Sequence, residues 1–298
     1  MSAGQIHDLG YKRYLGSRRS RGTRWTVIMR HQIATGWKTW WRFKIWLVFG
    51  ALATGIPAAL LYVFSTSVLR MFRGLGSGGA PFIDAILPLS LTWYCKIGFV
   101  ASLFLAAPAV AGDLQSGAFT FYFARSVRPR DYVLGKLAGL GLLISLIMLA
   151  GPLVLASARL GLSDDFDQLV ALLPILPKAL AIGVLGTLVY AAVPLGFSAL
   201  LSRRGLAMAM WTAYYVVISN LVFLISLATS PVLGALDLPS ALQAVALQLF
   251  DLRMGGRRVI DIPLDAALVS ILGHAAIAIA LVFWRVRAAQ RTGVGGAS

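Results

Sequence analysis

The chain has 298 residues, of which 58% are hydrophobic and only 13% are charged, and its mean hydropathy is +0.79. A soluble domain of this size needs more charged side chains to cover its surface, so the composition indicates an all-α integral membrane protein. The net charge is +16, and anionic lipid headgroups account for that basic balance more simply than nucleic acid does.

The first 45 residues are polar and basic. Residues 1–23 lack a hydrophobic period and are expected to form a flexible cytoplasmic tail. Residues 24–45 instead place cations on one helical row and indoles on a neighbouring apolar face, which is typical of a helix lying in the membrane interface. The expected interface residues are Arg30, Trp37, Lys38, Trp40, Trp41 and Arg42. The alternative interpretation is a simple extension of the first span.

Six apolar stretches follow, each of about the 20 residues that a helix needs to cross the hydrocarbon core. They are 46–64, 87–111, 137–158, 179–201, 207–228 and 266–284, and they make up a transmembrane domain at 46–284. Before the last stretch, LPSALQAVALQLFDL is apolar but too short to span, which predicts a re-entrant or interfacial helix on the outer side. Residues 285–298 are expected to be a cytoplasmic tail.

The basic residues predict the orientation. With six spans both termini lie on one side, and placing them in the cytoplasm puts nineteen of the 27 lysines and arginines there. Seven fall on the outer side, and Lys96 lies within a span. This bias follows the positive-inside rule, so we expect a multi-pass protein of the plasma membrane (the inner membrane in bacteria) with both termini cytoplasmic.

Residues 112–136, GDLQSGAFTFYFARSVRPRDYVLGK, connect the second and third spans on the cytoplasmic side. Phe119, Tyr122 and Phe123 share one face of a short helix at i, i+3 and i+4. Pro129 is expected to break this helix, and Gly135 to allow close approach at the membrane edge. Because an aromatic face is unfavourable in water, we expect it to be buried in the interface or in a groove on a soluble partner.

This stretch resembles the signature of ABC type-2 permeases, the membrane subunits of ATP-driven exporters. In that family an acidic residue follows the second span, then come Gly-Thr, a Pro-x-Ser-Arg turn, and Gly-Lys opening the third span. The matching positions are Asp113, Gly117, Arg130, Gly135 and Lys136. The chain departs from the pattern at Ala118, Ser126 and Arg128-Pro129. The six spans, the N-terminal amphipathic helix and the long outer loop after the fifth span also match, so the resemblance covers nearly the whole chain.

The resemblance implies that 112–136 is a coupling segment, which sits in a cleft of a separate ATPase and transmits its closure to the spans. The expected coupling residues are Asp113, Gln115, Gly117, Phe119, Tyr122, Phe123, Arg125, Arg128, Arg130, Tyr132, Gly135 and Lys136. It also implies two permease chains, identical or paralogous, and two ATPase subunits per complex. ATP and Mg would belong to the ATPase, since this chain has no G-x-x-x-x-G-K-[ST] loop and no cofactor of its own is expected.

Three polar residues within the spans, Lys96, Asn220 and His274, are candidates for a translocation path. An ionisable group at membrane depth suggests a function. Snorkelling or a structural ion pair is the alternative for Lys96, and interhelical hydrogen bonds are the alternative for Asn220 and His274. No metal site is expected.

The sequence thus predicts the permease subunit of an ATP-driven exporter, with a lipid-like substrate slightly favoured because the spans offer few polar groups. The chain itself is not expected to be an enzyme, because it has three histidines, no glutamate and no H-E-x-x-H motif. The alternative function is a scaffold that anchors a cytoplasmic ATPase complex without moving a substrate.

Overall fold

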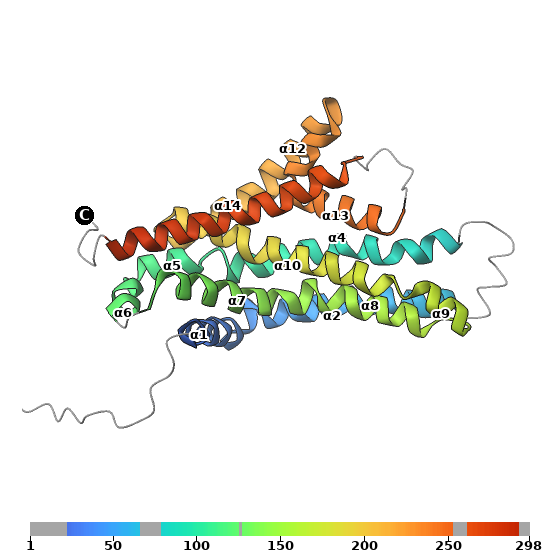
Figure 1. The fold of residues 1–298 in the computed structure, drawn as a ribbon, viewed down its shortest axis with the longest axis horizontal. Coiled ribbons are helices and arrows are strands. Elements are labelled where there is room, and N and C mark those ends of the chain that lie inside the picture. Colours follow the sequence, from blue (N-terminus) through green and yellow to red (C-terminus); the bar gives the residue numbers. More distant parts are fainter. Residues whose placement is uncertain (1–22, 66–78, 125–126, 253–260, 292–298) are drawn as a thin grey trace, which may run out of the picture.

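The computed structural model describes residues 23–65, 79–124, 127–252 and 261–291, and every regular element in these ranges is a helix. Six helical stretches among them are long and apolar enough to cross a membrane, which confirms the all-α, multi-span fold class. The spans run side by side along one axis (Figure 1). One end of the bundle carries α6 (Ala118–Ala124) and the last residues of α14 (Leu264–Arg291), and the other end carries α9 (Phe166–Leu172).

The first and last spans are the single helices α2 (Lys44–Ser65) and α14, and each of the other four is built from two or three helices in succession. These are α4 (Gly79–Leu105) with α5 (Ala109–Gln115), α7 (Pro129–Met148) with α8 (Ala150–Gly161), α9 with α10 (Ile175–Leu200), and α11 (Arg204–Thr212) with η3 (Ala213–Ile218) and α12 (Ser219–Ala228). Prolines explain two of the breaks. Pro108 and Pro152 have no N–H to donate to the carbonyl four residues earlier, and α4 and α7 end close to that carbonyl.

The third span begins earlier than the sequence predicts. Its helix starts at Pro129 rather than at residue 137, because proline suits the first helical position and Asp131 accepts a hydrogen bond from the Arg128 backbone N–H at 3.2 Å. Tyr132, Gly135 and Lys136 therefore belong to α7 and not to a connecting loop. Likewise, residues 285–291 continue α14, whereas the sequence predicts a tail from 285 onward; residues 1–22 and 292–298 lie outside the described part of the chain.

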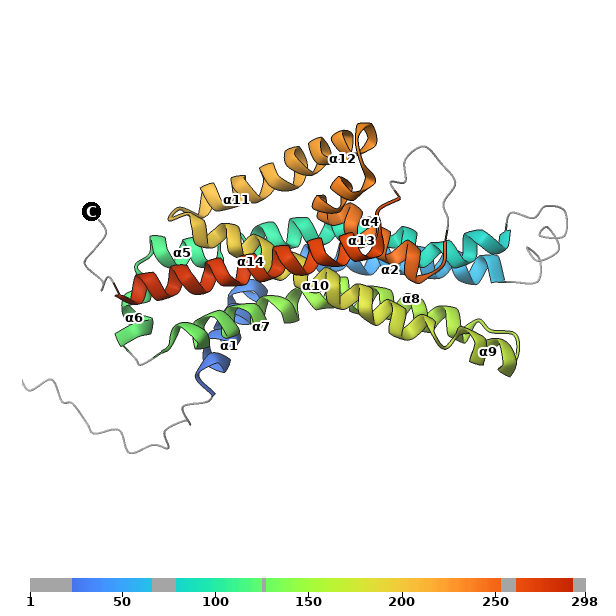
Figure 2. The same cartoon turned by 45° about the horizontal axis from the view of Figure 1, so that its top comes forward.

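The predicted N-terminal helix at 24–45 is divided in two. Helix α1 (Arg24–Lys38) ends at an extended Thr39, and a short 3₁₀ turn, η2 (Trp40–Arg42), leads into α2. Figures 1 and 2 show α1 crossing the spans instead of running along them. Glycines of α7 let it approach closely: a Cβ added at Gly135 would lie 2.6 Å from the Ile28 Cβ, and one at Gly139 would lie 2.9 Å from the Gln32 Cβ.

The short apolar helix α13 (Leu238–Leu249) follows η4 (Pro231–Leu236) and packs against α4, α10 and α14. Its buried residues include Leu238, Ala241, Leu242 and Val245. In Figure 1 it lies beside α14 and does not extend as far along the bundle as α9. The residues predicted as a short non-spanning helix are thus helical and largely buried within the protein.

An aromatic cluster packs the first half of the fifth span against α4. Trp211 is fully buried and donates its indole N–H to the Ser102 hydroxyl at 3.0 Å, and Tyr215 stacks on Phe99 with ring centroids 3.9 Å apart. Beyond this aromatic cluster, Figure 2 shows α12 standing away from the other spans. Several of its apolar side chains are exposed, with Leu224 at 61%, so α12 presents an apolar surface that the described residues do not cover.

Candidate functional site

The segment between the second and third spans forms a compact helical unit at one end of the bundle. Helix α5 ends at Gln115, the chain turns at Gly117, and α6 follows directly. Gly117 has φ of +67°, a conformation that side-chain-bearing residues rarely adopt. Arg125 and Ser126 lie outside the described residues, so nothing is inferred for the predicted coupling residue Arg125.

A serine on α10 holds the start of α5 in place. The first N–H groups of a helix have no partner within it. Here the backbone N–H groups of Val110 and Ala111 both donate to the Ser198 hydroxyl oxygen, at 3.0 and 2.9 Å, and all three residues are fully buried. Ser198 thus acts as a helix cap supplied from another span, and it fixes α5 to α10.

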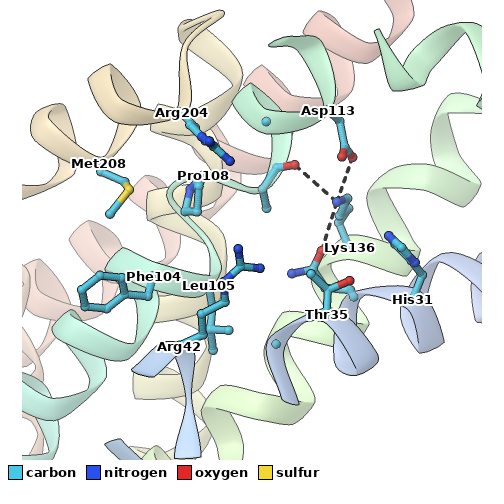
Figure 3. Close-up of a pocket in the computed structure, with 14 residues that line it drawn as sticks. His31, Thr35, Arg42, Phe104, Leu105, Pro108, Asp113, Lys136, Arg204 and Met208 are labelled. Carbon is cyan, nitrogen blue, oxygen red and sulfur yellow. Dashed lines mark hydrogen bonds and ion pairs between the residues drawn. The ribbon is translucent and has the colours of Figure 1, made fainter. Parts of the chain in front are cut away.

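A buried lysine joins three helices in what we name the Lys136 network (Lys136, Asp113, Gln32 and Tyr132). The Lys136 ammonium lies 2.8 Å from the Asp113 carboxylate and donates hydrogen bonds to the Gln32 side-chain oxygen at 3.0 Å and to the Ala109 carbonyl at 3.3 Å (Figure 3). Tyr132 donates its hydroxyl to the same carboxylate at 2.7 Å. All three ammonium protons therefore have an acceptor, as a charge with only 4% side-chain exposure requires.

The aromatic face of α6 packs against α7 of the same chain. Phe119 lies 5.1 Å and Tyr122 5.6 Å from the Tyr132 ring, and Phe119 stacks on Phe123 at 5.6 Å. Burial, followed by the nearby Asp113 charge, raises the pKa of Tyr122 to about 12. The sequence predicts that this face is buried in the interface or in a partner. In the structure Phe119 and Tyr122 contact Tyr132, which lies on α7 and not in the predicted loop, and α6 also packs against α14.

Some of the predicted coupling residues are exposed, and one exposed aromatic residue, Phe121, is not among those predicted. Phe121 is 71% exposed and points away from the α6 face that carries Phe119, Tyr122 and Phe123. The predicted coupling residues Gln115, Gly117, Arg128 and Arg130 are also exposed. Four others make contacts inside the chain: Asp113, Tyr132, Gly135 and Lys136. We refer to α5, the turn at Gly117 and α6 as the coupling surface.

The predicted interface residues all lie on the exposed side of α1 and η2. Trp37, Trp40 and Trp41 are 44%, 62% and 71% exposed, and Arg30, Lys38 and Arg42 are exposed as well. The buried side of α1 is formed by Ile28, Gln32 and Gly36. An exposed row of indoles with neighbouring cations suits the headgroup region of a bilayer.

The three polar residues predicted for a translocation path are not brought together. Lys96 is exposed on α4, with its ammonium 4.7 Å from the Trp93 ring. Asn220 donates to the Val216 carbonyl of its own span at 2.6 Å, and His274 bonds the Ser270 carbonyl at 2.8 Å. Within the described residues no cluster of three or more His, Cys or acidic residues could hold a metal ion.

A scan against protein-family models finds no family that matches this chain, and a search of curated proteins finds no match either.

Two residues of this site carry sequence signals that the predictions above do not use. Gln32 lies in the row of Ile28 and Gly36 at a spacing of four, which marks it as part of the buried face of α1. Phe121 lies on the opposite side of α6 from Phe119 and Phe123, so the helical period alone separates it from them. Ser198 carries no such signal, because its role depends on where α10 meets α5.

Proposed function

We propose that this chain is the membrane-spanning permease subunit of an ATP-driven exporter of the ABC type-2 kind, and that a separate ATPase binds its coupling surface. The observation that carries the proposal is Phe121, a large aromatic side chain that is exposed on a helix whose other aromatic residues are buried or partly buried. Arg128 and Arg130 are exposed nearby in sequence. An aromatic anchor flanked by arginines is typical of residues that dominate binding to a partner's groove.

The contacts beneath the coupling surface support a mechanical role. The Lys136–Asp113 pair links α5 to α7, Gln32 adds α1, and Ser198 adds α10. A push on α6 is therefore passed to several helices at once. Closure of the ATPase would tilt these helices as a unit, and a tilt of packed helices is one of the established forms of conformational switching.

A second permease chain would cover the surfaces that a single chain leaves exposed. Trp93 and Lys96 are exposed on α4, and α12 exposes an apolar face. A lysine facing lipid near the membrane centre costs about 2.5–3.5 kcal/mol, a cost that is avoided where a partner or a water-filled path surrounds it. In this proposal a lipid-like substrate moves along a path between two permease chains, and Lys96 lies at or near that path. Asn220 and His274 bond backbone carbonyls of their own spans and remain only candidates for that path.

The remaining features fit a bacterial inner-membrane protein with cytoplasmic termini. The α6 end of the bundle is assigned to the cytoplasm because nineteen of the 27 basic residues fall on that side. Helix α1 then lies in the cytoplasmic interface, and α13 is a re-entrant helix on the outer side. ATP and Mg are bound by the partner ATPase.

The proposal is tested by purification of the tagged chain from membranes in mild detergent, followed by identification of the proteins that come with it. We expect a phosphate-loop ATPase to accompany the wild-type chain and to be lost with Phe121→Asp. The matched control is Phe166→Asp, since Phe166 is 75% exposed on α9 at the opposite end of the bundle. Equal recovery of an ATPase with both variants, or no ATPase with the wild-type chain, contradicts the proposal.

Transport and scaffolding are distinguished in a second step. The purified complex is reconstituted in vesicles, and movement of fluorescent lipids between leaflets is measured with ATP and with a non-hydrolysable analogue. An exporter of lipid-like substrates moves the probe only with ATP. A complex that hydrolyses ATP but moves neither lipids nor other tested substrates is a scaffold.

A further inference from the structure

A cavity of about 440 Å³ opens beside the Lys136 network, at the α6 end of the bundle. Its walls come from α1, η2, the junction of α4 and α5, and the start of α11 (Figure 3). This volume falls within the range of cavities that hold small organic ligands. The Lys136 network lies on one side of the cavity, and its two charges, on Lys136 and Asp113, are paired with each other.

The cavity carries an excess of positive charge. Arg42 and Arg204 both line it, and Figure 3 shows their guanidinium groups directed into the space between them. Within the described residues neither guanidinium has an acidic or hydrogen-bonding partner. Asp113 is the one acidic residue in the lining, and its carboxylate is already bonded to Lys136 and Tyr132. The guanidinium groups of Arg42 and Arg204 thus have no counter-charge among the described residues. The paired N–H donors of a guanidinium group match the spacing of two phosphate oxygens.

An apolar wall of the lining lies on the same side of the cavity as the two arginines, across from the Lys136 network (Figure 3). It is formed by Phe104, Leu105 and Pro108 at the junction of α4 and α5 in the second span and by Met208 on the fifth span. Arg42 belongs to η2, which also carries the exposed indoles of Trp40 and Trp41. The cavity therefore offers cations beside an apolar surface at the level where indoles favour the membrane–water boundary.

We propose that this cavity binds the phosphate of an anionic glycerophospholipid, with Arg42 and Arg204 as its ligands and the apolar wall against the first carbons of the acyl chains. A soluble phosphate compound would use the two arginines but would leave the apolar wall without a partner. The bound lipid would connect α11 to η2. The inference does not depend on the permease function, since it rests only on the cavity.

The test is binding of phosphatidylglycerol to the purified full chain, measured by native mass spectrometry in detergent. The variant is Arg42→Gln/Arg204→Gln. The matched control is Arg203→Gln/Arg287→Gln, which removes the same charge from the residue next to Arg204 and from an exposed position on α14 but leaves the cavity lining intact. We expect the cavity variant to bind phosphatidylglycerol at least about tenfold more weakly, which corresponds to ~1.4 kcal/mol. The control should bind like the wild-type chain.

Two further arms identify the source of the phosphate. Phosphatidylcholine should bind more weakly than phosphatidylglycerol, and millimolar inorganic phosphate or glycerol phosphate should not displace the lipid. Equal binding by the two double variants, equal binding of the two lipids, or displacement by soluble phosphate overturns the proposal. If the cavity variant does not fold, the wild-type chain still decides the question: phosphatidylglycerol should raise its unfolding midpoint more than phosphatidylcholine does, and equal midpoints overturn the proposal.

Discussion

Replacement of Lys136 by Met tests whether the Lys136 network holds the α6 end of the bundle together. The substitution removes the ammonium and leaves the Asp113 carboxylate with the Tyr132 hydroxyl as its remaining bond. The acceptors on Gln32 and Ala109 lose their donor as well. Loss of one partner from a buried ion pair costs about 3–5 kcal/mol. Because the Asp113 side chain is 19% exposed and can recruit water, we expect the lower end of this range, about 3 kcal/mol.

The assay is thermal unfolding of the purified chain in detergent. A loss of about 3 kcal/mol lowers the midpoint by roughly 5 °C, because the entropy of unfolding of a chain of 298 residues is about 0.6 kcal/mol/K. The double variant Asp113→Asn/Lys136→Met should recover about 2 kcal/mol of this loss, because no unpaired charge remains and the amide oxygen that replaces the carboxylate would still accept from Tyr132.

Lys96→Met is the matched control, since the ammonium of Lys96 is exposed and contacts only the Trp93 ring among the described residues. Loss of this ammonium should not lower the free energy of unfolding by more than about 1 kcal/mol. The reasoning is refuted if Lys136→Met is as stable as the wild-type chain, or if the double variant is no more stable than Lys136→Met alone.

Three further predictions concern packing, capping and ionisation. Gly135→Leu should lower the unfolding midpoint and expose α1 to protease, because even a Cβ at this position would lie 2.6 Å from α1. Gly141→Ala should do neither, because a Cβ at Gly141 would meet no atom within 4 Å. Equal effects of the two substitutions would contradict the close approach of α1 to α7. Ser198→Ala should cost about 2 kcal/mol or more, since two buried N–H groups lose their acceptor, and an unchanged midpoint would speak against the cap. The raised pKa of Tyr122 favours its neutral form in the folded state, so its contribution to stability should be constant below pH 10 and decline as the pH rises toward 12. The difference in tyrosinate absorbance between the wild-type chain and Tyr122→Phe should appear with a midpoint near pH 12. A midpoint near pH 10 would show that the ring is not buried.

The existence of the six spans follows from hydropathy alone, because a helix in lipid satisfies its backbone internally and needs only apolar side chains. The ends of the spans do not follow from it. The polar run that begins at Pro129 is helical because Pro129 and Asp131 favour a helix start, and a hydropathy window gives no weight to that signal.

The position of the candidate site along the chain could be predicted from the sequence, but its contacts with other helices could not. The period of α6 correctly groups Phe119, Tyr122 and Phe123 on one face, but the ring that covers them, Tyr132, comes from another helix and is a tertiary contact. Lys136 was expected to open the third span, and its partner Gln32 is more than a hundred residues away in sequence. Periodicity describes one helix at a time, so contacts between helices remain beyond it.

The most direct test of the ATPase-coupling proposal is photo-crosslinking in intact membranes. A benzophenone-bearing phenylalanine analogue is placed at Phe121 on the coupling surface, and in a separate chain at Phe166 at the opposite end of the bundle. The proposal predicts that irradiation links the chain at position 121, and not at 166, to a protein with a phosphate-binding loop. Crosslinks from position 121 to lipid alone, or to no ATPase, would contradict it.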